Sequence, residues 1–586
     1  MVTMSNFPLA IIYVLGAVLL LILPRRTRSS AALAFSVVAF IFLLHLETGA
    51  ILTVPFLNYE LVLCRVDRLS LVFGYVFVIM GFLGGVYGFH VKDTLQQVTS
   101  LLYVGGSLGV VFAGDLFTLF VSWEIMTLSS VCLIWARRTT QSSRAGMRYF
   151  IVHLFGGSIL MAGIIWHLGE TGSILFNHFE GGIASYLILF AFALNAAVPP
   201  LNGWLPDAYP EGTVAGSVFL SAFTTKVAVY ALARGFAGLE LLMWAGAVMA
   251  VYGVVLAFLA NDGRRLLAYH IISQVGYMVC GVGIGTKMGV NGAIAHAFAH
   301  ILYKGLLFMG MGAVLYATGR SKMTELGGLV RSMWPALVLF MIGAFSISGV
   351  PLFSGFVSKS MVIHAAELEH LGIVVLLLHL ASIGTFLSIG LKLPYFTWFS
   401  TDRSLKPKPV PLGMYLGMGL TSAICIAIGV YPALLYNLLP FAIHYQPYTA
   451  SHVIETMQLL IFTGLAFWLV RKKLHAEATI TLDTDWVYRR PSRLAYTVFS
   501  VSVCRLFGAV EDLSLRLVRF MVKLGANPPG YLIETIRNAG YVFFRTQKPA
   551  PEPSTFSPDR YRISLGIMVI VVLLCLVVIL AWDFLF

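Results

Sequence analysis

The sequence has 586 residues, of which 59% are hydrophobic and only 11% are charged, and its mean hydropathy is +0.87. These values exclude an ordinary water-soluble protein and predict a polytopic membrane protein. The formal net charge of +13 is typical of basic loops on the cytoplasmic side of a membrane, so we expect no nucleic acid partner. The six cysteines form no CxxC pair and no glycine-rich phosphate loop follows a strand-like segment. We therefore expect no metal, cofactor or disulfide framework in this chain.

Sixteen apolar segments approach the length of about 20 residues that crosses a bilayer. The first has no charge before it and basic residues after it, which favours a membrane helix over a signal peptide. Proline and glycine interrupt two segments, 183–209 and 331–366, and so predict broken helices there. The expected fold is an all-α membrane protein with helices near 7–23, 31–53, 70–88, 98–114, 116–136, 144–167, 183–209, 213–236, 241–260, 264–285, 291–317, 331–366, 371–398, 411–437, 452–470 and 563–585.

The basic loops all fall on one side of the membrane under this count. They lie at 24–28, Lys92, 137–144, 261–265, 319–322, 406–408 and 471–473. The positive-inside rule makes this the cytoplasmic side and predicts a multi-pass protein of the cell (inner) membrane.

The two interrupted segments run in opposite directions across the membrane, an arrangement typical of inverted repeats. We therefore predict N-terminal helices (1–97), a first repeat (98–236), a second, inverted repeat of five helices like the first (241–398), and flanking helices (411–471). An amphipathic lateral segment (472–562) and a final crossing (563–585) follow. Within the lateral segment, residues 505–525 have apolar residues at helical spacing with basic residues between them. This pattern favours a helix along the membrane surface or against partner subunits, with a plain cytoplasmic linker as the alternative.

Five ionisable residues lie inside predicted membrane segments, where a charge is costly and needs a reason: Glu124, Lys226, Lys304, Lys359 and Lys392. Two histidines, His296 and His300, precede Lys304 at intervals of four, so the three share one helix face. A lone buried histidine is usually structural, whereas three titratable groups on one face favour a polar path. Lys392 lies nearer a segment end, so snorkelling to the interface is a stronger alternative for it than for Lys226.

Six motifs in this order resemble one family: "LFTLFVSWE", "PLNGWLPDAYPEG", "FTTKVAVYALAR", "RRLLAYHIISQVGYMVCG", "HAFAHILYKGLLFMG" and "SGVPLFSGFVSK". The family comprises the antiporter-like membrane subunits of respiratory complex I, membrane-bound hydrogenases and Mrp-type cation/proton antiporters. The resemblance covers about residues 60–400 and is strongest to the Mrp D-type subunits. It implies partner membrane subunits in a larger complex and transport of H⁺ or Na⁺. The segment near 505–525 also resembles the lateral helix of the distal complex I subunit.

The resemblance also implies an ion path. The family's glutamate on the fifth helix matches Glu124, and its lysine on the eighth matches Lys226. Its His/Lys cluster matches His300 and Lys304, and the residue that ends its broken twelfth helix matches Lys359.

The sequence departs from the family on the broken seventh helix. Asn195 occupies the position of the lysine that pairs with the glutamate, and Asn202 replaces a histidine. An amide carries no proton, so Glu124 either couples to Lys226 instead or belongs to a half-channel that passes something else. The amide oxygens also suit a hard cation such as Na⁺. We rank coupling to Lys226 first.

Three hypotheses follow. The first is an ion-translocating subunit that uses the relay Glu124, Lys226, His300, Lys304 and Lys359. The second is a non-conducting structural subunit that bridges its partners, for which Asn195 is the best support. The third is a redox enzyme subunit that itself binds quinone or metal; no ligand cluster in the sequence supports it, although the chain can belong to a redox-driven complex.

Overall fold

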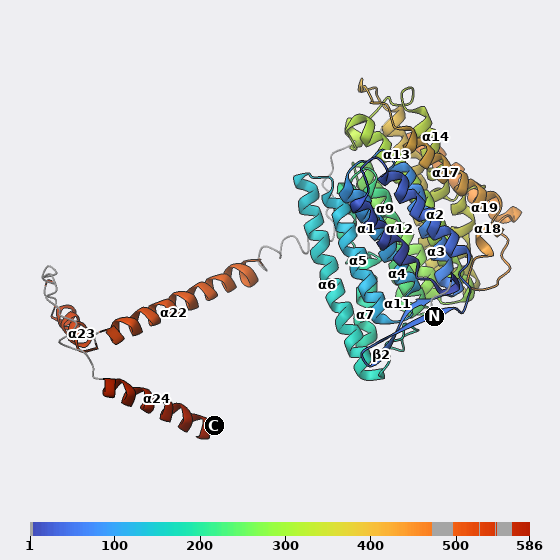
Figure 1. Ribbon diagram of the computed structural model, residues 1–586. Helices are drawn as coiled ribbons and strands as arrows, with labels where there is room; N and C mark the ends of the chain where they lie inside the picture. The colour runs from blue at the N-terminus through green and yellow to red at the C-terminus, as the bar shows by residue number, and fades with distance from the viewer. Residues whose placement is uncertain (1–3, 472–495, 527, 545–546, 548–564, 586) are drawn as a thin grey trace. The chain divides into compact units, whose positions relative to one another are not determined.

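A computed structural model describes residues 4–471, 496–526, 528–544, 547 and 565–585 (Figure 1). The chain divides into two compact units, Met1–Trp486 and Val487–Phe586. The larger unit is a helical bundle.

The N-terminal part of the larger unit differs from the predicted all-α fold. A helix was expected over 31–53, but α2 ends at Leu44 and residues 51–65 form an antiparallel hairpin. Gly49, with a φ of 93°, lies in the turn that leads into the hairpin, and the following Thr-Val-Pro run favours an extended edge strand. The elements are α1 (Leu9–Ile22), α2 (Arg28–Leu44), β1 (Ile51–Phe56), β2 (Tyr59–Arg65) and α3 (Arg68–Tyr87).

The next part contains the first predicted break, which the structure confirms. The helix that begins at Ile183 stops at Asn195 and resumes only at Trp204. The predicted segment over 213–236 contains one candidate span, Gly216–Gly235, in which Phe223 leaves regular helical geometry and separates two short helices. The elements are α4 (Thr94–Phe112), α5 (Leu116–Trp135), α6 (Thr140–Thr171), α7 (Ile183–Asn195), α8 (Trp204–Ala208), α9 (Gly216–Ala222) and α10 (Thr224–Gly235).

The third part contains the second predicted break, also confirmed, between α14 and α15. The helix after it, α16, continues into π-helical turns over 386–392 and 395–399. The elements are α11 (Glu240–Leu259), α12 (Gly263–Ile284), α13 (Lys287–Thr318), α14 (Trp334–Ser348), α15 (Ser354–Leu368), α16 (Gly372–Thr385), α17 (Leu412–Val430), α18 (Ala433–Tyr436) and α19 (Ala450–Val470).

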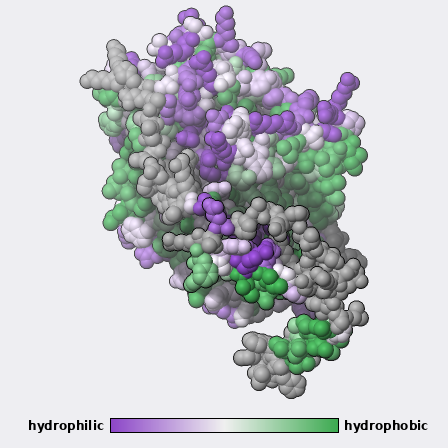
Figure 2. All heavy atoms as spheres, turned by 90° about the vertical axis from the view of Figure 1, so that its left-hand side faces the viewer, coloured by the Kyte–Doolittle hydropathy of each residue, from purple (hydrophilic) through white to green (hydrophobic). Residues whose placement is uncertain are grey.

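The long helix α13 forms the centre of this bundle. It packs against α3, α9, α12, α14, α15 and α17, and almost all of its side chains are buried. By contrast, α6 and α19 expose large apolar side chains such as Ile151, Phe155, Ile461 and Phe462. In Figure 2 hydrophobic side chains gather along the flanks of the larger unit, as expected for surfaces in contact with lipid.

The smaller unit contains the predicted amphipathic helix as α22 (Ser502–Ala526), followed by α23 (Pro528–Phe543) and α24 (Leu565–Leu585). Residues 472–495 and 548–562 of the predicted lateral segment lie outside the described residues.

The predicted number of sixteen crossings is not settled by helix length. Among the described residues, eleven helices are long and apolar enough to cross a membrane on their own. Five more are apolar but shorter: Leu9–Ile22, Arg28–Leu44, Ile183–Asn195, Trp334–Ser348 and Gly566–Val578. Two of these, Ile183–Asn195 and Trp334–Ser348, are halves of the broken helices. The inverted relation between the repeats likewise stays a prediction.

One buried carboxylate, Asp115, joins the hairpin to the start of α5. Its Oδ1 accepts a hydrogen bond from the backbone N–H of Thr118 at 2.8 Å and its Oδ2 accepts one from the N–H of Val62 at 2.7 Å. Asp115→Ala removes a helix cap and leaves a buried N–H without an acceptor. We expect a loss of roughly 2–4 kcal/mol of stability, measured as a lower melting temperature of the purified protein in detergent. Asp115→Asn retains one acceptor oxygen, so its melting temperature should lie between those of wild type and the alanine variant. An alanine variant as stable as wild type would contradict this role.

Candidate functional site

The first group of polar side chains lies where α5, α6 and α7 meet. Glu124 on α5 is half-buried and its carboxylate lies directly over Gly157 of α6, where an added Cβ would collide with Oε1. A Cβ at the neighbouring Gly156 would lie 3.9 Å from the Oδ1 of Asn195 at the end of α7. The glycine pair therefore leaves room for a carboxylate over Gly157 and for an amide near Gly156. Glu124 Oε1 and Asn195 Nδ2 have no hydrogen-bond partner among the described residues.

The two asparagines of the break point to different neighbours. Asn195 is the last residue of α7, whose end is held by a hydrogen bond from the indole N–H of Trp204 to the carbonyl of Leu194 at 3.0 Å. Asn202 is fully buried and donates to the hydroxyl of Tyr252 on α11 at 3.4 Å. Only Asn195 therefore lies beside the glycine pair that receives Glu124, and Asn202 joins the break to the second half of the bundle.

Lys226 lies at the second interruption of this region, between α9 and α10. Its side chain is completely buried, and its Nζ donates to the carbonyl oxygen of Ser221 at 2.6 Å. That carbonyl belongs to the last turn of α9. Because the helix is interrupted at Phe223, no backbone N–H of a following turn occupies this carbonyl. The ammonium group is thus held by backbone rather than by a carboxylate.

The predicted His/Lys face forms one continuous stripe on α13. His296, His300 and Lys304 are completely buried. His296 has two partners: its Nδ1 lies 3.1 Å from the hydroxyl of Ser358, and its Nε2 lies 3.4 Å from that of Tyr303. Both ring nitrogens of His300 and the Nζ of Lys304 find no protein partner in the described part of the chain. The stripe therefore combines one fixed imidazole with two groups whose hydrogen-bonding capacity is unused.

Lys359 on α15 lies beside the second broken helix. Its Nζ donates to the carbonyl of Ile347, in the last turn of α14, at 2.8 Å and to the hydroxyl of Ser382 on α16 at 3.5 Å. It also lies 5.2 Å from the ring centroid of Tyr277. The ring of Tyr277 is in turn 5.6 Å from that of His296. Tyr277 therefore stands between Lys359 and the stripe on α13.

Lys392 occupies a different setting. Its Nζ donates to the carbonyls of Phe258 and Ala260, the latter at 3.3 Å, at the carboxyl end of α11. A cation at a helix C-terminus is stabilised by the orphan carbonyls there. The structure therefore gives Lys392 a structural role as a helix cap, alongside the predicted one in the ion path.

Two buried residues on α12, His270 and Gln274, were missing from the sequence prediction. His270 Nε2 lies 2.6 Å from the hydroxyl of Ser388, and Gln274 Nε2 donates to the hydroxyl of Thr385 at 3.3 Å. With Tyr277 they form an i, i+4, i+7 face. The same spacing rule that identified the stripe on α13 would have found them in the motif "RRLLAYHIISQVGYMVCG".

A further buried histidine, His153 on α6, also escaped the sequence prediction. It stacks on Tyr149 with ring centroids 3.9 Å apart, and its Nε2 has no acceptor or donor among the described residues. One helical turn separates it from Gly156 and Gly157. Ionisable and amide side chains from seven helices (α5, α6, α7, α10, α12, α13 and α15) thus lie inside an apolar bundle, an arrangement typical of membrane subunits with a polar path through their core.

Comparison with known proteins identifies the family. Residues 113–388 match the transmembrane family of NADH:quinone oxidoreductase and Mrp antiporter subunits. An uncharacterized protein of Methanocaldococcus jannaschii is 30% identical over 60% of this chain and 78% of its own length. The chain belongs to this antiporter family of membrane subunits.

Two further likenesses agree with this assignment. The D-type subunit of the Na⁺/H⁺ antiporter from Alkalihalophilus pseudofirmus is 33% identical over 45% of this chain, and the match spans 58% of that relative. A chain of the membrane-bound sulfane sulfur reductase, an archaeal respiratory membrane complex, has the same fold, with a TM-score of 0.69 over 86% of this chain and 94% of its own at 23% identity.

The unpartnered Lys304 makes a prediction about stability. An amine that is fully buried without a partner costs about 1–3 kcal/mol relative to an apolar group of similar shape. Lys304→Met should therefore raise the melting temperature of the purified complex. Lys359→Met is the matched control, because it removes the bonds to Ile347 and Ser382 and should give a smaller gain or none. A lower melting temperature for Lys304→Met would show that Lys304 has a stabilising partner.

Proposed function

We propose that this chain is an ion-translocating subunit of a multi-subunit membrane complex of the Mrp antiporter and complex I type, located in the cell's inner membrane. The observation that supports this most directly is the series of buried ionisable side chains on α10, α13 and α15, two of which, His300 and Lys304, have no partner among the described residues. Burying such groups costs several kcal/mol each. A bridging subunit gains nothing from that cost, whereas a subunit that moves protons needs groups that gain and lose them inside the membrane.

The proposed relay has an ordered core. Lys226, His300 and Lys304 come first, followed by His296, which contacts Tyr277, and then by Lys359, which lies against the same tyrosine ring. His270 and Gln274 extend the polar face of α12 beside this path. Breaks next to Lys226 and Lys359 leave both amines bonded to backbone carbonyls, from which they can turn without separating a buried ion pair.

The entrance group of this relay is Glu124. With Asn195 in place of a lysine, Glu124 has no cationic partner on α7, and we propose that it couples to Lys226 instead. The glycine pair of α6 leaves room for its carboxylate over Gly157 and for the amide of Asn195 near Gly156, and oxygen ligands of both kinds also suit Na⁺. The second candidate function, a non-conducting subunit that bridges its membrane partners, is favoured by this same replacement, because an amide transfers no proton.

The first experiment measures dissipation of a pH gradient in inverted vesicles that contain the whole complex. Lys226→Ala should reduce proton flux on the order of tenfold or more, because it removes the first amine of the relay. Repeating the assay with and without added Na⁺ identifies the ion exchanged. Unchanged flux in the variant, with the complex assembled to the wild-type level, would favour the non-conducting subunit.

A second experiment tests the position of Glu124. Gly157→Ala places a methyl group where Glu124 Oε1 now lies and forces the flexible carboxylate to move, so we expect flux to fall severalfold without loss of assembly. Gly156→Ala is the matched control: its new methyl group meets Leu194 at 3.3 Å, a contact that the leucine side chain can relieve. Equal flux in the two variants would show that the carboxylate position does not matter.

A further inference from the structure

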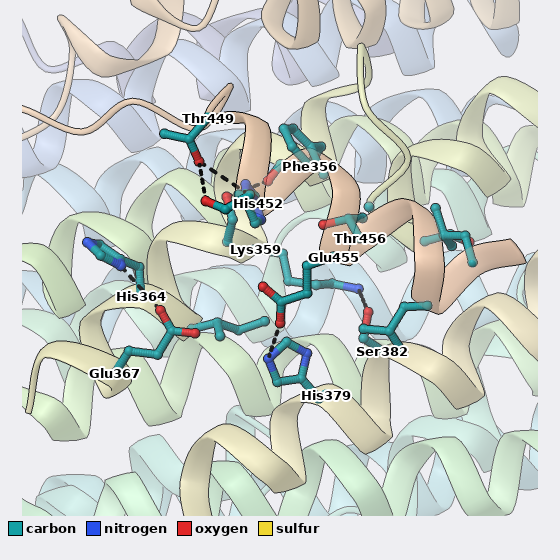
Figure 3. Close-up of a pocket in the computed structure, with 18 of the residues that line it drawn as sticks. Phe356, Lys359, His364, Glu367, His379, Ser382, Thr449, His452, Glu455 and Thr456 are labelled. Carbon is teal, nitrogen blue, oxygen red and sulfur yellow. Dashed lines mark hydrogen bonds and ion pairs between the residues drawn. The ribbon is translucent and has the colours of Figure 1, made fainter. Parts of the chain in front are cut away.

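A cavity of about 560 Å³ lies against Lys359, between α15, α16, α19 and the loop that precedes α19. Figure 3 shows Lys359 among the side chains that line it. Although Lys359 is only 3% exposed, it forms part of the cavity wall. The cavity therefore brings open space to a group that the rest of the bundle buries.

Titratable groups line the cavity from every element around it. His364 and Glu367 of α15 are paired, with Nδ1 and Oε2 3.3 Å apart. His379 of α16 faces Glu455 of α19, with Nε2 and Oε1 3.9 Å apart (Figure 3). His444 and Tyr445 of the loop and His452 at the start of α19 complete the wall. Burial raises the pKa of Tyr445 to about 12, so this hydroxyl stays neutral. No group of three ligands suited to a metal ion occurs among the described residues.

The position of Glu455 is the unusual feature. It lies in the second turn of an otherwise apolar membrane helix and is the only acidic or basic residue in α19 besides His452. A carboxylate is tolerated there when it lines a water-filled space or has a partner, and the cavity and His379 supply both. Glu455 lies beyond the residues that match the family, 113–388.

One contact and one shared helix face connect the His379–Glu455 pair to Lys359 of the relay. Ser382 Oγ lies 3.5 Å from the Nζ of Lys359. His379 is three residues before Ser382 on α16, so the two side chains share a face of that helix. The path from Lys359 to His379 is therefore one helical turn long and passes a hydroxyl.

The loop that lines the cavity, with His444 and Tyr445, belongs to the side opposite the basic loops. The chain leaves the basic loop at 319–322, crosses through α14 and α15, and reaches the far side after Leu368. From the basic loop at 406–408 it crosses again through α17 to the far side, where the loop before α19 lies, and α19 ends at the basic run 471–473. The positive-inside rule makes the side of this loop non-cytoplasmic.

We propose that this cavity is the vestibule through which Lys359 exchanges protons with the non-cytoplasmic side, and that the His379–Glu455 pair is its proton-exchanging group. The proposal rests on the proposed function and names H⁺ as the ion at this end, because imidazole takes up protons and does not bind Na⁺ when protonated. The ammonium of Lys359 gives its proton by way of Ser382 to His379 and becomes a neutral amine. The imidazolium, stabilised by the carboxylate of Glu455, then gives that proton to water in the cavity.

The vestibule is tested independently of transport by thiol labelling. Thr456 and Ser360 line the cavity, and the matched control Leu465, on the same helix as Thr456, is exposed but does not line it. In the assembled complex, Thr456→Cys and Ser360→Cys should react with a charged, membrane-impermeant methanethiosulfonate only when it is added on the non-cytoplasmic side, and at least tenfold faster than Leu465→Cys. Wild type gives the background of the six native cysteines. No labelling of either cavity cysteine would overturn the vestibule whether or not the complex transports ions.

The exchanging pair is tested by flux in matched variants. Glu455→Gln removes the carboxylate that faces His379 and should reduce flux severalfold, and Glu455→Asp should restore flux in part. His379→Gln should also reduce flux severalfold, whereas Glu367→Gln, which alters the other pair, should leave flux unchanged. Labelled cysteines together with wild-type flux in Glu455→Gln and His379→Gln would overturn the role of the pair but leave the proposed relay intact.

Discussion

Backbone carbonyls at the ends of helices hold three of the lysines inside this protein. Lys226 is bonded to the carbonyl of Ser221, Lys359 to that of Ile347, and Lys392 to that of Ala260. Each carbonyl belongs to a helix that stops, and so lacks the amide that would follow in an unbroken helix. A membrane interior offers an ammonium group few partners, and a carboxylate partner would hold it tightly. The carbonyls at the helix ends are a neutral partner instead, so the same places where helices stop also bind these lysines.

Lys304 shows the contrast, because α13 runs without a break for 32 residues. The carbonyls of α13 around Lys304 are engaged within the helix. No carbonyl at a helix end reaches the Nζ of Lys304 in the described structure. The neighbouring His300 is in the same condition. The centre of the bundle therefore combines a continuous helix with polar groups that have no partner, whereas the carbonyls at the breaks bind Lys226 and Lys359.

Sequence alone predicted the features that depend on local chemistry. Proline and glycine identified both broken helices, and the spacing of four placed His296, His300 and Lys304 on one face. It failed where tertiary contact decides: the apolar run before Pro55 pairs as a hairpin instead of extending α2, and Phe223 interrupts a helix without any glycine or proline. His379 meets Glu455, and Tyr277 meets Lys359, from helices far away in the chain, so these contacts could not be inferred from periodicity.

The ring of Tyr277 has a mechanical consequence. Its hydroxyl donates to the carbonyl of Leu378 on α16, while its ring lies against both Lys359 and His296. The same helix forms one wall of the cavity through His379. Any displacement of α16 that widens or narrows the cavity therefore pulls on the ring that separates Lys359 from the interior stripe. A change in the width of the cavity is therefore transmitted through the side chain of Tyr277 to its contacts with Lys359 and His296.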